Sequence, residues 1–149
     1  GECLGGAMYT EDFRRMLYRL GVPDYRVVSS GVIEPSNPDL ERRCGNARFY
    51  SMTVRFFKLP QLEDRCEDYG QVAWYQGTLA HAPNRFVLDD HHVFLAGKPM
   101  LVCSNTAAML SATRFQKHFR IDGDLSTHYG LFDCGPEPTA DSGDVGACC

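Results

Sequence analysis

The segment ARFYSMTVRFFK, residues 47–58, constrains the fold more than any other part of the chain. Its side chains alternate with a period of two, so that Tyr50, Met52, Val54 and Phe56 fall on one face and their neighbours on the other. This alternation is typical of a half-buried β-strand. We therefore predict a strand over residues 47–58.

Segments of both helix and strand type precede this strand. Residues 10–20 combine Thr10 as a capping residue, acidic residues in the first turn and a glycine stop, which predicts a short amphipathic helix. Residues 25–33 are rich in β-branched side chains and predict a strand. The pair formed by Asn37 and a following proline predicts a second helix, over residues 38–44.

The second half of the chain also predicts strands and a helix. Residues 71–78 predict a strand, which we expect to be the antiparallel neighbour of residues 47–58. Residues 91–95 and 99–103 are separated by Ala-Gly-Lys, as a hairpin requires, and a helix is expected to begin at Asn105. The expected fold class is α+β, with mostly antiparallel small sheets and short packing helices.

The chain is expected to divide into three regions. These are residues 1–82, residues 83–133, and a polar tail over residues 134–149 that ends in cysteine. The tail is too polar and its side chains too small for us to expect it to pack.

The charge of the chain disfavours several classes of partner. Its 15 Lys and Arg residues are outnumbered by 19 Asp and Glu residues and form no basic run, which argues against nucleic acid and anionic membranes as partners. No apolar segment approaches the roughly 20 residues that a membrane-spanning helix needs. The first 20 residues include charged residues at Glu11, Asp12, Arg14 and Arg15, where a signal peptide would need an apolar stretch. We expect a cytoplasmic location.

Cysteine is the residue type that suggests chemistry. The number of cysteines is odd and no pair has CxxC spacing, so thiols are expected in place of a disulfide framework or a structural zinc site. The seven are Cys3, Cys44, Cys66, Cys103, Cys134, Cys148 and Cys149.

Several sequence motifs follow one another along the chain in an order that can be compared with known families. They are GECLGG at the start, RFYSMTVRFFKLPQLEDRCEDYGQVAWYQGT over residues 48–78, then DDHHVF, CSNTAAML and HYGLF. In this order they resemble the carboxy-terminal part of S-adenosylmethionine-dependent arsenite methyltransferases, and the resemblance covers most of residues 2–133. It implies an enzyme of arsenic detoxification in which As(III) is held by cysteine thiolates.

The resemblance also implies a partner domain. In that family a dinucleotide-fold domain that binds S-adenosylmethionine lies upstream, whereas this chain has no glycine-rich strand-to-helix turn with a downstream ribose-binding acid. We therefore expect the chain to be part of a longer enzyme, with that methyl-donor domain as its partner. Methyl transfer would then depend mostly on positioning, so no catalytic side chain is expected here.

Trivalent arsenic is a soft centre, and thiolates are the protein ligands that match it. The resemblance assigns Cys3, in GECLGG, as the first metalloid ligand. At a position where some relatives have a second cysteine, this chain has Ala47, which cannot bind arsenic. Cys44 and Cys66 are the two candidates for the second ligand, and a small thiol such as glutathione is a candidate third.

Other polar and sulfur-containing residues are expected to be structural. Cys103 ends an apolar strand and is expected in the core. Cys134 and the terminal pair belong to the tail and are expected to form no site, the alternative being that Cys148 and Cys149 bind arsenic or pass it inward. Residues 89–92, Asp-Asp-His-His, are expected to form a solvated turn and not a metal site. The alternative function is a stand-alone thiol-rich module that binds arsenite or soft metals without catalysis.

Overall fold

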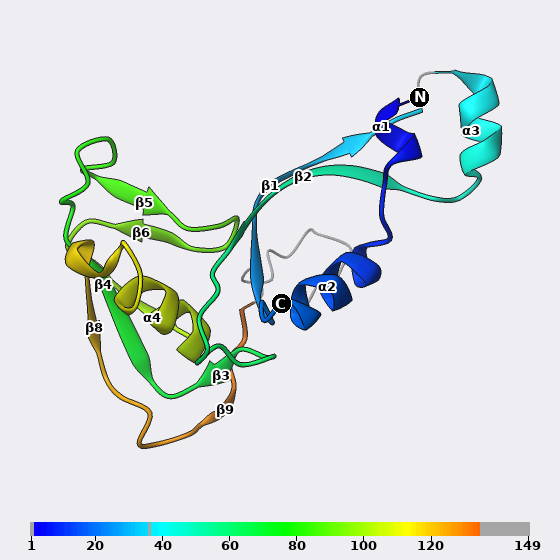
Figure 1. The fold of residues 1–149 in the computed structure, drawn as a ribbon. Helices are drawn as coiled ribbons and strands as arrows, with labels where there is room; N and C mark the ends of the chain where they lie inside the picture. Colours follow the sequence, from blue (N-terminus) through cyan, green and yellow to red (C-terminus); the bar gives the residue numbers. More distant parts are fainter. Residues whose placement is uncertain (1, 36, 135–149) are drawn as a thin grey trace.

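The computed structural model describes residues 2–35 and 37–134 of the chain (Figure 1). The described part is an α+β fold whose paired strands are antiparallel, as predicted. The elements are α1 (Glu2–Gly5), α2 (Thr10–Arg19), β1 (Tyr25–Ile33), α3 (Pro38–Cys44), β2 (Phe49–Phe56), β3 (Glu67–Asp68), β4 (Gln71–Tyr75), β5 (Arg85–Val87), β6 (Val93–Leu95), β7 (Pro99–Val102), α4 (Ser104–Ser111), the 3-10 helix η1 (Gln116–His118), β8 (Phe119–Asp122) and β9 (Gly130–Leu131).

A long two-stranded ribbon dominates the first half of the chain. Strands β1 and β2 pair from Tyr25 opposite Phe56 to Ile33 opposite Phe49, which confirms the strands predicted in both segments. Helix α3 lies in the connection between them, and Figure 1 shows α1 and α3 at the same end of the ribbon. The other end of the ribbon leads to the core.

The core surrounds a three-stranded sheet of order β7-β4-β8, on which α4 packs. The ring of Tyr75 on β4 lies 5.9 Å from that of Phe86 and 5.0 Å from that of Phe119, measured between centroids. Phe94 on β6 adds an edge-to-face contact with Phe119 at 5.1 Å. Burying these rings and the aliphatic residues between them supplies the main hydrophobic stabilisation of this part.

Two predicted strand pairings are wrong. Strand β4 pairs with β7 and β8 and not with β2, whose partner is β1. Residues 93–95 form no hairpin with residues 99–102, because β6 pairs with β5 while β7 pairs with β4. The turn between β6 and β7 instead crosses between sheets, where the N–H of Gly97 donates to the carbonyl of Tyr75 at 2.8 Å. Contacts between distant segments decide which strands pair, and the alternation of side chains along a single strand does not reveal them.

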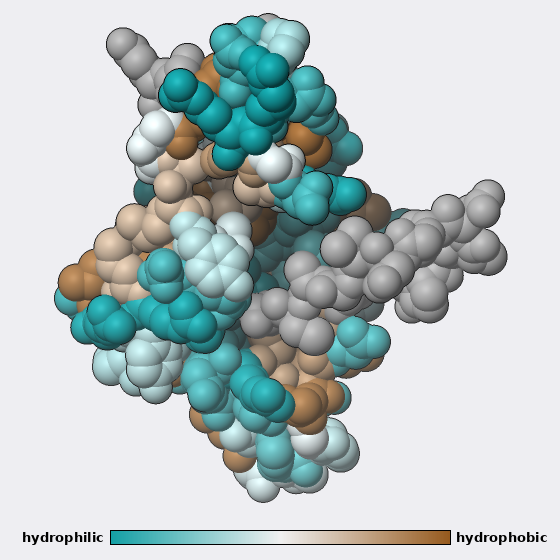
Figure 2. Space-filling model, turned by 90° about the vertical axis from the view of Figure 1, so that its right-hand side faces the viewer, coloured by the Kyte–Doolittle hydropathy of each residue, from teal (hydrophilic) through white to brown (hydrophobic). Residues whose placement is uncertain are grey.

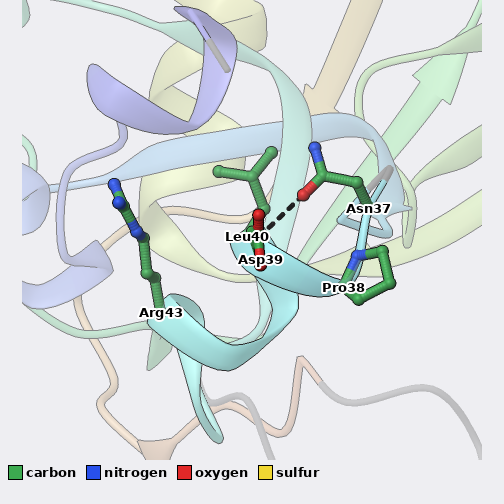
Figure 3. Close-up of a pocket in the computed structure, with 5 residues that line it drawn as sticks. All are labelled: Asn37, Pro38, Asp39, Leu40 and Arg43. Carbon is green, nitrogen blue, oxygen red and sulfur yellow. Dashed lines mark hydrogen bonds between the residues drawn. The ribbon is translucent and has the colours of Figure 1, made fainter.

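The helix starts were predicted in part. Asn37 caps α3 as expected, its Oδ1 accepting the N–H of Leu40 at 2.9 Å beside the shallow surface hollow drawn in Figure 3. Helix α2 is preceded by Tyr9, which makes no side-chain cap, so the prediction of a capping Thr10 is wrong. Helix α4 begins at Ser104, and its cap is the sulfur of Cys103.

The surface of the described part mixes polar and apolar residues. Figure 2 shows hydrophobic residues in several separate areas of one face with hydrophilic residues between them. Large exposed apolar side chains include Tyr18 on α2, Leu20 directly after α2, and Val32 and Tyr50 on the ribbon. Within the residues that the structure describes, no helix has the length and apolar character needed to cross a membrane.

Candidate thiol site

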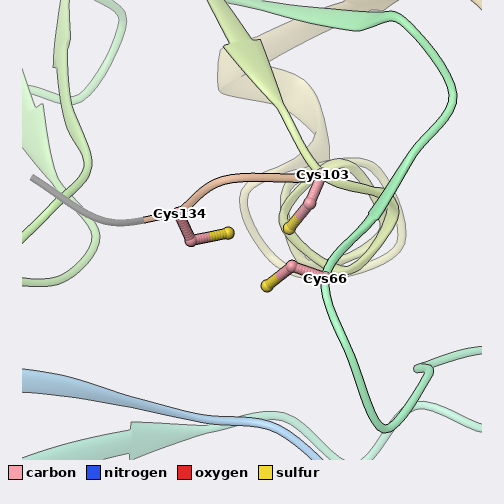
Figure 4. Close-up of side chains that lie close together, drawn as sticks. All are labelled: Cys66, Cys103 and Cys134. Carbon is pink, nitrogen blue, oxygen red and sulfur yellow. The ribbon is translucent and has the colours of Figure 1, made fainter. Parts of the chain in front are cut away.

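Three cysteines that are far apart in the sequence lie together in the structure. Cys66 comes from the loop before β3, Cys103 from the junction of β7 and α4, and Cys134 from the segment after β9. Their sulfur atoms all lie within 4.8 Å of one another, and Figure 4 shows the three side chains pointing toward a common centre. Cys66 and Cys103 are buried, and Cys134 is half-buried. We call these residues the three-cysteine cluster.

Short strand pairing brings Cys134 to Cys66. Strand β3 pairs with β9, with Glu67 opposite Leu131, and the N–H of Phe132 donates to the carbonyl of Cys66 at 2.8 Å. The last described residues are thereby fixed along the loop that carries Cys66. The cluster is thus a product of tertiary pairing and has no spacing signature in the sequence.

A buried asparagine fixes the same loop against α4. Oδ1 of Asn105 accepts the N–H of Glu63 at 2.8 Å, and its Nδ2 donates to the carbonyl of Glu63 at 2.8 Å. The same Nδ2 lies 3.4 Å from the carbonyl of Arg65, the residue before Cys66. Asn105 is 1% exposed, so these bonds are shielded from water and hold the loop next to Cys103.

The surroundings of Cys103 favour its thiolate form, and its pKa lies below the ordinary value of a cysteine. Hydrogen bonds from the thiols of Cys134 and Cys66 lower the pKa of Cys103; burial opposes them, and the charge of Arg26 and the hydroxyl of Thr106 lower it further. Its sulfur also accepts the backbone N–H of Thr106 at 3.4 Å, in the first turn of α4. An anion at this position is favoured by the helix dipole as well as by the cation.

Arg26 supplies the buried positive charge beside the cluster. Its Nη2 lies 3.8 Å from the sulfur of Cys103 and 2.7 Å from Oδ2 of Asp24, and its Nη1 lies 3.5 Å from Oδ2 of Asp89. Burial alone would lower the pKa of Arg26, but the anions Asp24, Cys103 and Asp89 raise it above its ordinary value. The guanidinium is therefore permanently charged and oriented by two carboxylates.

The turn at residues 89–92 differs from our expectation. Asp89 is 2% exposed and His92 is 5% exposed, whereas Asp90 and His91 face solvent. Asp89 accepts the backbone N–H groups of His91 and His92 and the Nδ1 of His92 at 2.8 Å. Burial raises the pKa of Asp89, but the bond and charge of His92 and the charge of Arg26 together lower it. The expectation of a solvated turn is thus wrong for half of it, because Arg26 draws Asp89 inward from a distant strand.

Asp89, Asp90 and His91 form a second group of potential ligands within 4.8 Å of one another. Asp89 is already bonded to Arg26 and His92, and His91 Nδ1 lies 2.5 Å from Oδ1 of Asp90. Asp90 and His91 are both exposed. This group is explained by its internal bonds and needs no ion.

The predicted site residues fall in different places. Cys66 lies in the three-cysteine cluster, together with Cys103, which was expected only as core, and Cys134, which was expected in the tail. Cys44 ends α3, at the end of the ribbon away from α4 (Figure 1). Cys3 lies within the short helix α1, which lies at the same end of the ribbon as α3 (Figure 1). Cys148 and Cys149 are outside the described residues.

The low pKa of Cys103 predicts a pH-dependent stability. Below about pH 8.5, the ordinary pKa of a cysteine, the unfolded chain keeps a proton on Cys103 that the folded protein has lost. The stabilisation of the folded state by this group is therefore fully present above that pH and is lost as the pH falls toward the folded pKa. Between about pH 6 and pH 8 the opening free energy of β7 and α4 should rise with pH by about 1 kcal/mol per unit more than in Cys103→Ala. Hydrogen exchange at both pH values measures this difference, and equal slopes would contradict a Cys103 thiolate.

Comparison with known proteins identifies the family. The family described as the arsenite methyltransferase C-terminal domain matches residues 68–142. An arsenite methyltransferase of Aquipseudomonas alcaligenes is 48% identical over 136 residues, which are 91% of this chain and 39% of that protein. The enzyme of Rattus norvegicus is 37% identical over 121 residues, 80% of this chain and 31% of that protein.

A solved structure has the same fold. It is an arsenic (III) S-adenosylmethionine methyltransferase from Chlamydomonas reinhardtii, with a TM-score of 0.84 and 47% sequence identity, covering 89% of this chain and 44% of that one. This chain thus spans less than half the length of each of these relatives. It belongs to the family of arsenite methyltransferase C-terminal domains.

Proposed function

We propose that this chain is the metalloid-holding part of an arsenite methyltransferase, which transfers a methyl group from S-adenosylmethionine to As(III). The observation that carries the proposal is its 48% identity to an arsenite methyltransferase across 91% of its length. The four cysteines whose side chains the structure describes are thiols, which supports a reducing compartment such as the cytoplasm.

The methyl donor is assigned to a different domain. S-adenosylmethionine supplies an electrophilic methyl group when bound. The described sheets contain only antiparallel strand pairs, apart from an isolated parallel bridge between Tyr75 and Ala96. They therefore offer no crevice at the carboxyl ends of adjacent parallel strands, where dinucleotide folds bind their ligands. The described residues do not fit the donor, and its binding belongs to the amino-terminal partner domain.

The role of this chain is to hold the substrate. Arsenous acid exchanges its hydroxide groups for thiolates, with each displaced hydroxide leaving as water after it takes a proton. Cys3 is the thiol that we assign first to the substrate, with Cys44 as its partner. The bounds of α1 and α3 support this pairing, because both helices lie at one end of the β1–β2 ribbon (Figure 1). We accordingly propose that residues 1–82 carry the substrate site and residues 83–133 form the carboxy-terminal region.

The complete enzyme provides the test. Purified protein containing this chain should convert As(III) to methylated arsenicals when S-adenosylmethionine is present. Binding of As(III) without any methylated product would support a stand-alone thiol-rich module instead.

The second ligand can be tested in the same assay. Cys44→Ser should raise the KM for As(III) by at least about tenfold, because an alcohol is a poor ligand for a soft metalloid. Cys148→Ser is a matched control that should leave the KM unchanged. An unchanged KM in Cys44→Ser would remove Cys44 from the substrate site.

A further inference from the structure

We propose that Cys66, Cys103 and Cys134 form a second As(III) site with three sulfur ligands, separate from the Cys3 and Cys44 site and independent of methyl transfer. The sulfur atoms come from three segments of the chain and converge within 4.8 Å of one another (Figure 4). Cys66 would thereby be an arsenic ligand in a site other than the Cys3 site for which the sequence made it a candidate.

The number of ligands matches a trivalent metalloid. As(III) binds three sulfur atoms in a pyramid and keeps a lone pair on its open side. Zinc in structural sites takes four protein ligands. Among the described residues, the group that includes Cys66 contains only the three cysteines and offers no fourth His, Asp or Glu ligand. The three-cysteine cluster therefore has the full ligand set for As(III) and is one ligand short of a structural zinc site.

The charge of the surroundings favours the same ion. Arg26 already faces two carboxylates, Asp24 and Asp89, so these three groups carry one net negative charge, and their side chains are only 6%, 7% and 2% exposed. Three thiolates with As(III) carry no net charge, so a loaded cluster would bring no additional charge into this buried network. Three thiolates with a divalent ion would keep one negative charge there, which is costly in a region of low dielectric.

The binding reaction is a ligand exchange without redox change. Three As–O bonds of arsenous acid break and three As–S bonds form. Each thiol proton leaves with one hydroxide as water, and a hydroxide displaced by a cysteine that is already a thiolate takes its proton from solvent. The half-buried Cys134 provides the side from which arsenous acid enters.

Three ligands also imply selectivity. Inorganic As(III) has three exchangeable hydroxides, whereas monomethyl As(III) has only two and leaves one sulfur without a bond. We therefore expect the three-cysteine cluster to prefer the inorganic form over a methylated product. It would retain substrate and release methylated arsenic.

The experiment uses the complete enzyme in the background Cys3→Ser with Cys148→Ser and Cys149→Ser, which removes the first assigned substrate thiol and the vicinal thiol pair at the end of the chain. Sodium arsenite is added, bound arsenic is counted after dialysis, and arsenic X-ray absorption counts the sulfur ligands. One arsenic per chain with three sulfur ligands is expected. Addition of Cys134→Ser should weaken binding at least about 100-fold, more than the loss of an outer-shell partner costs. The control Cys44→Ser should bind like the background.

Several outcomes would overturn the proposal: no bound arsenic in the background, two sulfur ligands in place of three, or full binding after Cys134→Ser. If the variant with Cys134→Ser fails to fold, alkylation of the background protein, which does not carry that substitution, still tests the site. Arsenite should protect Cys66, Cys103 and Cys134 together from alkylation in the background protein, as peptide mapping detects, and equal alkylation with and without arsenite contradicts the site. Methylation by the unmodified enzyme tests the proposed function separately, because it does not depend on this result.

Discussion

Replacing Cys3 by serine is expected to lower kcat/KM for As(III) methylation by the complete enzyme at least about 100-fold, the scale on which a misplaced reactant slows an enzyme. Cys3 lies in α1, in the segment that matches the family motif GECLGG. A serine hydroxyl is a hard oxygen ligand and binds a soft metalloid weakly. The arsenic lone pair would then no longer be held in line with the donor methyl group.

The Cys3 prediction has a matched control. Cys149→Ser changes a thiol to an alcohol at a position for which we expect no site, and it should leave kcat/KM unchanged. Thermal unfolding of both variants checks that the fold is kept. Methylation by Cys3→Ser within a factor of about three of the unmodified rate would contradict the assigned substrate thiol.

The largest expected loss of stability follows the substitution Arg26→Met. Methionine removes the guanidinium from between Asp24, Asp89 and Cys103, and each of these anions would remain buried. Removing one partner of a buried ion pair typically costs about 3–5 kcal/mol. Hydrogen exchange of the β4 and β7 amides, whose strands pair beside the cluster, should show a drop of that size in their opening free energy.

Arg120→Met is the comparison for Arg26→Met. Arg120 lies on β8 of the same sheet and pairs with Asp122 at 3.0 Å, but the two side chains are 58% and 49% exposed. An exposed pair contributes at most about 1 kcal/mol, so this variant should change the opening free energy little. Equal losses in the two variants would contradict the structural role given to Arg26.

The sequence predicted elements better than their partners. The period of two over residues 47–58 correctly indicated β2, since alternation is a local property of the backbone. It did not indicate that β2 pairs with β1, or that β4 lies between β7 and β8. These choices depend on burying Tyr75 against Phe86 and Phe119, residues from distant segments.

At the candidate site, too, the sequence did not predict which distant residues lie together. The apolar sequence PMLVC correctly predicted that Cys103 is buried, but burial and ligand binding are compatible. Cys103 faces Arg26, 77 positions away in the chain, and the β3–β9 pairing sets Cys134 beside Cys66. No spacing rule connects these residues, so the sequence offered Cys66 only as a candidate for the Cys3 site and did not predict that the three cysteines lie together.

A single-turnover experiment tests the central claim most directly. Enzyme containing this chain is loaded with two equivalents of As(III), one for each proposed site, freed of excess arsenite and given S-adenosylmethionine with an isotopically labelled methyl group. The account predicts labelled methylarsenic from the unmodified protein and none above background from Cys3→Ser. Loaded protein that keeps all its arsenic as inorganic As(III) would contradict the methyltransferase assignment.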